Sequence, residues 1–410
     1  MKTELLAPAG DLEKLKAAVL YGADAVYLGG RHFGLRAGAG NFEDAELAEG
    51  VSFAHAHGAR VYVTVNIFAH NRDLELLPPY LDTICEVGAD AVIVSDPGVI
   101  NITRRRHPKL PVHLSTQANT TNWASARFWE EHGIKRIVLA RELTLAEISE
   151  IREKIGLELE LFVHGAMCVS YSGRCLLSSY MTGRDANRGD CAQSCRWKYA
   201  LAEEKRPGEY FPFEEDSRGS YILGSKDLCL IEHIPELVRA GVNSFKIEGR
   251  MKSVNYVAGV VKAYREALDT YQGDPENYRF NPAWLEEIEK VSHRDYTTGF
   301  LFGRPGHSGQ HYEGEIYRRS HEFAGLVRGY EPETGMMVIE QRNRFVLGDE
   351  VEIMMPKGEN IKQKITGIID EAGQSVAAAP HPQQLVRVPV DGQVPEFAIM
   401  RRLITNREDF

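Results

Sequence analysis

The chain has 410 residues, of which 43% are hydrophobic and 26% are charged, and its formal net charge is −10. This composition is typical of a folded globular protein and excludes an intrinsically disordered chain. The apolar runs are too short to span a bilayer, and the N-terminal residues lack the apolar core of a signal peptide, so we expect a cytoplasmic protein with no membrane partner. The negative charge argues against non-specific coating of nucleic acid, although a local basic patch would still allow RNA binding.

Short apolar, β-branched runs alternate with amphipathic helical stretches over the first 273 residues. Strands are predicted at 4–7, 25–28, 61–67, 91–94, 112–115, 136–140, 158–163 and 244–247. Helices are predicted between them at 12–21, 43–57, 74–87, 124–133 and 144–154. Eight near-continuous apolar strands separated by helices predict an α/β fold of the TIM-like (β/α)8 barrel type. A doubly wound open sheet is the alternative, disfavoured because no G-x-G-x-x-G motif follows the first strand.

The barrel pattern is interrupted after the seventh strand by a long insertion at 164–225, and it ends with a strong helix at 254–271. A connecting segment is expected at 274–310. From 311 to 410 the pattern is all-β, with strand-like runs at 325–329, 335–340, 350–353, 364–369, 385–388 and 397–401. Turn signals separate these runs, which predicts a small C-terminal antiparallel β-barrel domain.

Four of the six cysteines lie in the insertion: Cys168, Cys175, Cys191 and Cys195. In a reducing compartment such clustering favours a metal site or catalysis over disulfides. The spacing C-x6-C-x15-C-x3-C suits a four-thiolate iron–sulfur cluster, whereas zinc sites usually show two close cysteine pairs. Spacing alone therefore leaves a 4Fe–4S cluster and zinc both open. The remaining two, Cys85 and Cys229, are expected to be core residues.

The residues around this signature resemble a known family. The segment 160–178, with Cys168 and Cys175, is similar to the signature of the U32 (collagenase-like) peptidase family, and the segments 4–10, 21–27, 187–196 and 246–253 extend the similarity over almost the whole chain. Within that family the chain most resembles the branch that forms 5-hydroxyuridine in tRNA.

The resemblance implies an oxygen-independent hydroxylation of the wobble uridine of tRNA, with prephenate as the hydroxyl donor. It also implies an iron–sulfur cluster on Cys168, Cys175, Cys191 and Cys195, and it leaves room for a paralogous protein as a partner. Prephenate carries two carboxylates, which arginine binds bidentately, so Arg141 and Arg250 are the candidate clamps.

Polar residues at the C-terminal ends of the predicted strands are the remaining site candidates, because active sites of parallel barrels lie there. His164 adjoins the cysteine segment and is expected to transfer a proton near neutral pH. Lys246 and Glu248 are expected either to take part in catalysis or to pair with each other. Tyr27 and Asn66 are expected to bind substrate. The aromatic residues near the cysteines would stack on a nucleobase or pack the loop: Tyr171, Tyr180, Trp197 and Tyr199.

Two other functions stay open. The family name implies a peptidase, but the chain has no H-E-x-x-H motif, and its nearest approach to G-x-S-x-G fails at Gln310. A Cys168–His164 nucleophile would leave the other three cysteines unexplained. The second alternative is a non-catalytic RNA-binding module that uses the small β-domain.

Overall fold

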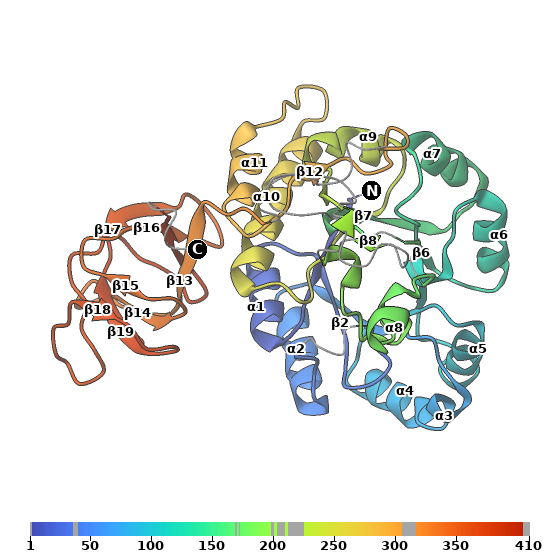
Figure 1. The fold of residues 1–410 in the computed structure, drawn as a ribbon, viewed down its shortest axis with the longest axis horizontal. Coiled ribbons are helices and arrows are strands. Elements are labelled where there is room, and N and C mark those ends of the chain that lie inside the picture. The colour runs from blue at the N-terminus through green and yellow to red at the C-terminus, as the bar shows by residue number, and fades with distance from the viewer. Residues whose placement is uncertain are drawn as a thin grey trace.

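Eight parallel strands close on themselves in the larger part of the chain (Figure 1). The computed structural model describes residues 2–35, 40–168, 170–171, 173–197, 201–202, 210–211, 225–305 and 317–404. The barrel strands are β1 (Glu4–Pro8), β2 (Ala25–Leu28), β3 (Arg60–Val65), β4 (Ala91–Val94), β5 (Val112–Leu114), β6 (Arg136–Val138), β7 (Glu158–Ala166) and β11 (Ser244–Ile247). Strand β11 pairs with both β1 and β7, which closes the barrel and confirms the predicted TIM-like fold.

Helices surround these strands on the outside (Figure 1). They are α1 (Leu12–Leu20), α2 (Asp44–Ala56), α3 (Asn71–Leu74), α4 (Leu77–Glu86), α5 (Pro97–Arg106), α6 (Trp123–Glu131), α7 (Leu145–Lys154) and α10 (Val254–Gly273). The stretch predicted as one helix at 74–87 is two helices, and Pro78 lies in the first turn of α4, where its missing N–H costs nothing.

Three turns that lead from a helix into a strand share one design. A glycine with positive φ ends the helix, at +110° for Gly22 and +80° for Gly88 and Gly241, a conformation that side chains disfavour. Two residues later, an Asp or Asn side chain accepts a backbone hydrogen bond from a barrel strand; these acceptors are Asp24, Asp90 and Asn243. The turn residues therefore fix the strand entries rather than serve chemistry.

Charged side chains fill the N-terminal end of the barrel interior. Glu4, Arg136, Glu160 and Lys246, which we call the floor network, are each at most 4% exposed. Arg136 contacts Glu4 at 2.5 Å and Glu160 at 3.3 Å, and Lys246 contacts Glu160 at 2.8 Å. Buried charges are tolerated when each has a close partner of opposite sign, and the floor network meets that condition.

The C-terminal part forms an antiparallel sheet with its own hydrophobic core. Its strands are β13 (His321–Glu331), β14 (Met336–Gln341), β16 (Glu350–Met354), β17 (Ile361–Lys364), β19 (Leu385–Pro389) and β20 (Ile399–Leu403), in the order β17-β16-β20-β13-β14-β19. A separate pair consists of β15 (Phe345–Val346) and β18 (Ala378–Ala379). The antiparallel β-domain is thus confirmed as a half-barrel, but the strand predicted at 364–369 was wrong, since β17 ends at Lys364.

The smaller part lies beside α1, α10 and α11 (Pro282–Glu289) (Figure 1), and buried polar contacts join it to the barrel. Helix α11, in the predicted connecting segment, supplies Glu287, which with Glu352 binds the buried Arg401. Tyr21, just after α1, and Lys262 of α10 donate hydrogen bonds to backbone carbonyls of the smaller part. The sheet therefore rests on the outer helices, away from the barrel mouth. In the described part of the chain, every helix is too short or too polar to span a bilayer.

Candidate functional site

A cavity of about 450 Å³ opens at the barrel mouth, between the C-terminal ends of the strands and the inserted segment. All four clustered cysteines line it: Cys168, Cys175, Cys191 and Cys195. The barrel side is formed by residues that follow the strands: Gln117, Arg141, Ala166, Glu248 and Lys252. This is the end of the barrel where parallel α/β folds place their active sites.

The four thiols are free and are close enough to influence one another. Cys168 and Cys191 are exposed, while Cys175 and Cys195 are half-buried. Burial raises the pKa of the Cys195 thiol, Arg196 opposes this, and the other three thiols raise the pKa further. Four sulfur donors around one cavity are a ligand set for soft transition metals. Among the described residues, no three His, Cys, Asp or Glu side chains lie close enough together to hold one metal ion.

An ion pair ties the cysteine segment to the barrel. Arg188, in the short 3₁₀ turn Ala186–Arg188, donates to the two oxygens of Asp73 at 2.8 and 3.1 Å and to the carbonyl of Phe68 at 2.8 Å. The adjacent Asn187 donates from its side chain to the carbonyl of Cys175 at 3.0 Å. The Arg188 hydrogen bonds lower the pKa of Asp73 to about 2. This Asp73–Arg188 latch therefore links the loop after β3 to the backbone that carries Cys175.

Two further contacts shape the same segment. Helix α8 (Leu177–Thr182) places the buried Ser178, whose hydroxyl accepts from the backbone N–H of Ala192 at 2.9 Å, next to Cys191. Gly173 has a φ of +74°, and a Cβ there would lie 2.8 Å from Oε1 of Gln117. Only glycine allows this close approach of the segment to the end of β5.

Besides the four cysteines, two of the predicted site residues line the cavity. Arg141 follows β6, donates to the carbonyl of Ala166 at 2.9 Å and lies over the ring of Phe162 at 4.8 Å. Glu248 follows β11 and places Oε2 at 3.5 Å from the hydroxyl of Tyr27. Tyr27 itself is buried behind this wall and donates to the carbonyl of Ile247 at 2.9 Å. The structure thus brings Arg141 and Glu248 together with the thiols and places Tyr27 behind them.

His164 is turned away from the cavity. Strand β7 shifts register against β11, so that Phe162 pairs with Lys246 but His164 pairs with Ile247. The extra residue in β7 reverses the side that His164 faces, as β-bulges do. Its ring lies 5.5–5.9 Å from three tyrosine rings, those of Tyr256, Tyr264 and Tyr296. Burial lowers its pKa to about 3. The proton transfer predicted for His164 therefore finds no support in this geometry.

Lys246, Arg250 and Asn66 also lie off the cavity wall. Lys246 belongs to the floor network, paired with Glu160 and not with Glu248. Arg250 is buried and donates to two side-chain oxygens, those of Asn41 at 2.6 Å and Thr64 at 3.3 Å. Asn66 donates to Ser115 at 3.3 Å. Their catalytic or substrate-binding roles stay predictions, because nothing brings them to the thiols.

The cavity also contains residues that were not predicted as site residues. Lys252 lies two positions after Arg250, and Asp227 lies on β10 (Asp227–Cys229), which pairs antiparallel with β7. Burial alone would raise the pKa of Asp227, but Arg294, at 2.6 Å, holds it below the usual value. The available signal for Lys252 was its place after the eighth strand, but the sequence does not say which basic residue of that segment faces the cavity.

Large apolar side chains are exposed around the same region. Five belong to the cysteine segment: Tyr171, Leu176, Tyr180, Met181 and Trp197. Two more, Met251 and Tyr317, line the cavity. We call the four aromatic residues among these seven, Tyr171, Tyr180, Trp197 and Tyr317, the aromatic rim. Tyr199 and Lys198 lie outside the described residues. Exposed apolar side chains gathered at one place mark a binding surface more often than scattered ones do.

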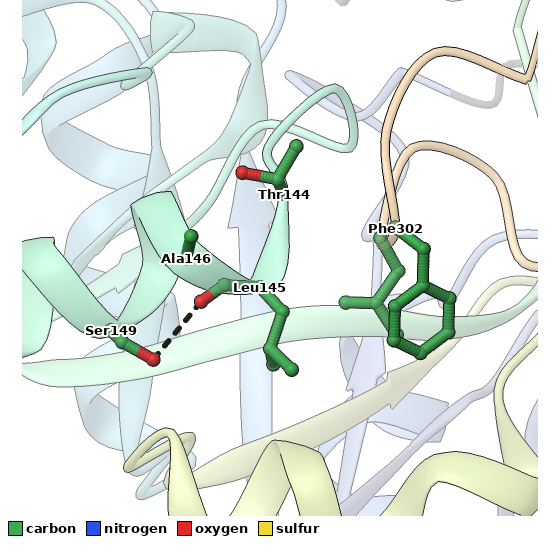
Figure 2. A pocket seen from close by; sticks show the side chains of 6 residues that line it. Thr144, Leu145, Ala146, Ser149 and Phe302 are labelled. Atoms are coloured by element: carbon green, nitrogen blue, oxygen red, sulfur yellow. Dashed lines mark hydrogen bonds between the residues drawn. The ribbon is translucent and has the colours of Figure 1, made fainter.

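A second cavity, of about 540 Å³, lies at the start of α7 (Figure 2). Its lining is Thr144, Leu145, Ala146, Ser149, Leu301 and Phe302, and Ser149 donates to the carbonyl of Leu145 at 3.0 Å. None of these lining side chains is charged or carries a thiol, and the polar ones are the hydroxyls of Thr144 and Ser149. The cysteine cavity, which gathers the predicted thiols with Arg141 and Glu248, is the candidate site.

This chain is similar to known proteins over most of its length. The model of peptidase family U32 matches residues 10–311, and that of the U32 C-terminal domain matches residues 319–401. The tRNA hydroxylation protein P1 of Bacillus subtilis is 47% identical over 98% of this chain and 95% of its own. The 23S rRNA 5-hydroxycytidine C2501 synthase of Escherichia coli is 38% identical over 75% of this chain and 46% of its own. An uncharacterized protease of Methanocaldococcus jannaschii, MJ0090, is 42% identical over 91% and 90%.

Proposed function

The chain belongs to peptidase family U32, and from this premise we propose that it is an RNA-modifying enzyme that hydroxylates tRNA. The specific reaction we propose is the oxygen-independent formation of 5-hydroxyuridine at the wobble position. The observation that carries the proposal is the convergence of four free thiols on one cavity at the barrel mouth. Relatives whose names state hydroxylation of tRNA or rRNA support the same reaction class.

The thiols fit an iron–sulfur cluster as the cofactor. Four cysteines are the usual ligands of a 4Fe–4S cluster, and such a cluster, when bound, supplies one-electron redox chemistry. The spacing C-x6-C-x15-C-x3-C also lacks the two close cysteine pairs that are usual for zinc. Cys168, Cys175, Cys191 and Cys195 would hold it.

The cavity's charge suits a small organic acid, and we propose prephenate as the hydroxyl donor. Arg184 is neutralised by Asp190 at 2.8 Å, and Asp227 by Arg294. The wall also carries Arg141, Arg196 and Lys252, together with the carboxylate of Glu248. Two carboxylates on the ligand would therefore find more positive than negative charge around them.

The aromatic rim suits an unpaired nucleobase. Single-stranded RNA is recognised by stacking its bases on aromatic side chains, and a target base must leave its stack to reach a reactive centre. Tyr180, at 82% exposed, and Trp197, at 44%, offer such faces next to the thiols. Glu248, on the cavity wall and beside the hydroxyl of Tyr27, is the group that we expect to hold or release a proton during the reaction.

The peptidase alternative has less support from the cavity. A cysteine nucleophile needs a base within hydrogen-bond reach, and no histidine is among the described residues that line the cavity. A non-catalytic RNA-binding module would leave the four converging thiols without a purpose. A paralogous protein as a partner stays a prediction.

The modified nucleosides of tRNA test the proposal directly. In a strain that lacks this gene and any paralogue, we expect 5-hydroxyuridine to be absent from digested tRNA by mass spectrometry. The wild-type gene and a Cys85→Ser variant should restore it, whereas Cys191→Ser should not. Unchanged 5-hydroxyuridine in the deletion strain would contradict the tRNA assignment, and gelatin cleavage that depends on one cysteine alone would favour the peptidase.

A further inference from the structure

We propose that Lys252 is the residue that binds a carboxylate of the small acid in the cysteine cavity. The inference rests on the proposed function and deepens it, because it names the contact that selects a carboxylate. It also replaces Arg250, which the sequence favoured as a clamp but which lies off the cavity wall.

The ammonium group of Lys252 is held at the wall by aromatic rings. Its Nζ lies 5.1 Å from the ring centroid of Tyr256 and 5.3 Å from that of Tyr317, and it donates one hydrogen bond, to the carbonyl of Ser292 at 3.2 Å. Two rings at these distances attract a cation without neutralising its charge. An ammonium has three N–H donors, so hydrogen-bonding capacity remains for a ligand.

Lys252 differs in this respect from the two other basic residues of its segment. Lys246 forms an ion pair with Glu160, and Arg250 donates to Asn41 and Thr64. In the part of the chain that the structure describes, no carboxylate lies within ion-pair distance of Lys252. The acidic neighbours that it senses are Asp227 and Glu248.

Asp227 does not serve as the missing partner. Arg294 donates to it from two side-chain nitrogens, at 2.9 and 2.6 Å, and from its backbone N–H at 3.1 Å. That carboxylate is therefore already neutralised. A half-buried cation without a counter-ion gains more from a ligand anion than an exposed one, because solvent screens it less.

The cavity places Lys252 so that a small dicarboxylic acid can be held at two points. Lys252 follows β11, Arg141 follows β6, and Arg196 comes from the cysteine segment, so the three cations come from three different parts of the wall. A volume of about 450 Å³ is within the range of small-molecule sites. We assign one carboxylate to Lys252 and the other to the arginines.

Binding of carboxylates to the full-length, anaerobically purified protein tests this assignment. The probes are prephenate and succinate, measured by calorimetry, and the variants are Lys252→Met, Lys252→Arg and a control, Lys364→Met. Lys364 is an exposed lysine of β17 that pairs with Glu350 at 3.4 Å, so its loss removes the same charge far from the cavity. We expect Lys252→Met to raise the dissociation constant of prephenate about tenfold or more, Lys252→Arg about threefold, and Lys364→Met not at all.

The outcomes separate this inference from the proposed function. Unchanged affinity in folded Lys252→Met overturns the role of Lys252 and leaves the function standing. If the wild-type protein binds succinate but not prephenate, and this binding requires Lys252, the carboxylate-binding role of Lys252 is supported and the proposal of prephenate as hydroxyl donor is overturned. Wild-type protein that binds neither acid overturns both. If Lys252→Met loses its fold by circular dichroism, Lys252→Gln, which keeps a donor for Ser292, provides the same comparison.

Discussion

The charged groups at the two ends of the barrel interior differ in whether they have a partner of opposite sign. At the floor, Glu4, Arg136, Glu160 and Lys246 are almost fully buried, and each lies against a partner of opposite sign. At the mouth, four thiols and the ammonium of Lys252 line a cavity. On the strands, fixed register places buried charges next to partners of opposite sign, which limits the free-energy cost of burying them. The segments after the strands carry the groups that can contact a ligand. Charge type alone therefore does not separate structure from function in this chain.

The largest expected effect is loss of a thiol at the mouth. Cys191 is exposed, so Cys191→Ser should change the free energy of unfolding by no more than about 0.5 kcal/mol. Loss of a metal ligand should nevertheless lower hydroxylation on the order of 100-fold or more. Quantitative nucleoside mass spectrometry with thermal unfolding measures both. Cys85→Ser, in α4, is the matched control and should keep activity; equal loss in both variants would contradict the account.

A substitution in the floor network should lower stability rather than activity alone. Lys246→Met leaves Glu160 buried without its lysine and should lower the free energy of unfolding by about 3–5 kcal/mol. The double variant Lys246→Met/Glu160→Gln should recover part of that loss, as denaturant titrations would show. A stable Lys246→Met protein without activity would instead assign Lys246 the catalytic role that the sequence suggested.

A smaller effect is expected at the latch that joins the two regions. Asp73→Asn weakens the contact with Arg188 and should cost about 1 kcal/mol, with faster alkylation of Cys175 in the metal-free protein. Asp82→Asn is the matched control, because Asp82 binds Arg106 through two hydrogen bonds on the outer helices. If both variants leave the alkylation rate unchanged, the latch does not hold the cysteine segment.

The latch also predicts a pH dependence. The pKa of Asp73 is lowered to about 2 in the folded state, against about 4 for an unperturbed aspartate. A depressed carboxyl pKa stabilises the fold above the unfolded value, so this contribution is complete above about pH 4 and is lost as the pH falls towards 2. The stability difference between wild type and Asp73→Asn should shrink over that window in acid titrations, and a constant difference would contradict the assignment.

An effect on RNA binding without an effect on stability is expected at the aromatic rim. Tyr180 is 82% exposed, so Tyr180→Ala should leave stability unchanged. Loss of the stacking contact between the Tyr180 ring and one base should raise KM for tRNA about tenfold with little change in kcat. Phe302→Ala is the control, because Phe302 is also exposed but lines the second cavity (Figure 2), which shares no lining residue with the cysteine cavity. Equal KM values in the two variants would remove the rim from RNA binding.

Local pattern predicted the barrel well but not the directions of its side chains. Near-continuous apolar runs located all eight strands, with β2, β4 and β11 correct to the residue. The bulge in β7 turns His164 outward, and no hydrophobic period reveals a single inserted residue. Sequence patterns also do not reveal side-chain direction in the segment between β11 and α10. There Lys252, and not Arg250, lines the cavity. The four cysteines could be singled out from spacing, which requires no knowledge of register; they line one cavity, and their role as metal ligands stays a prediction.

Metal and sulfide analysis of the anaerobically purified wild-type protein tests the central claim most directly. If the four thiols at the mouth hold a 4Fe–4S cluster, the protein should contain about four iron and four sulfide per chain and absorb broadly near ~400 nm. Cys85→Ser should keep this content and Cys191→Ser should lose it. A colourless protein with one zinc per chain and no sulfide would contradict the claim.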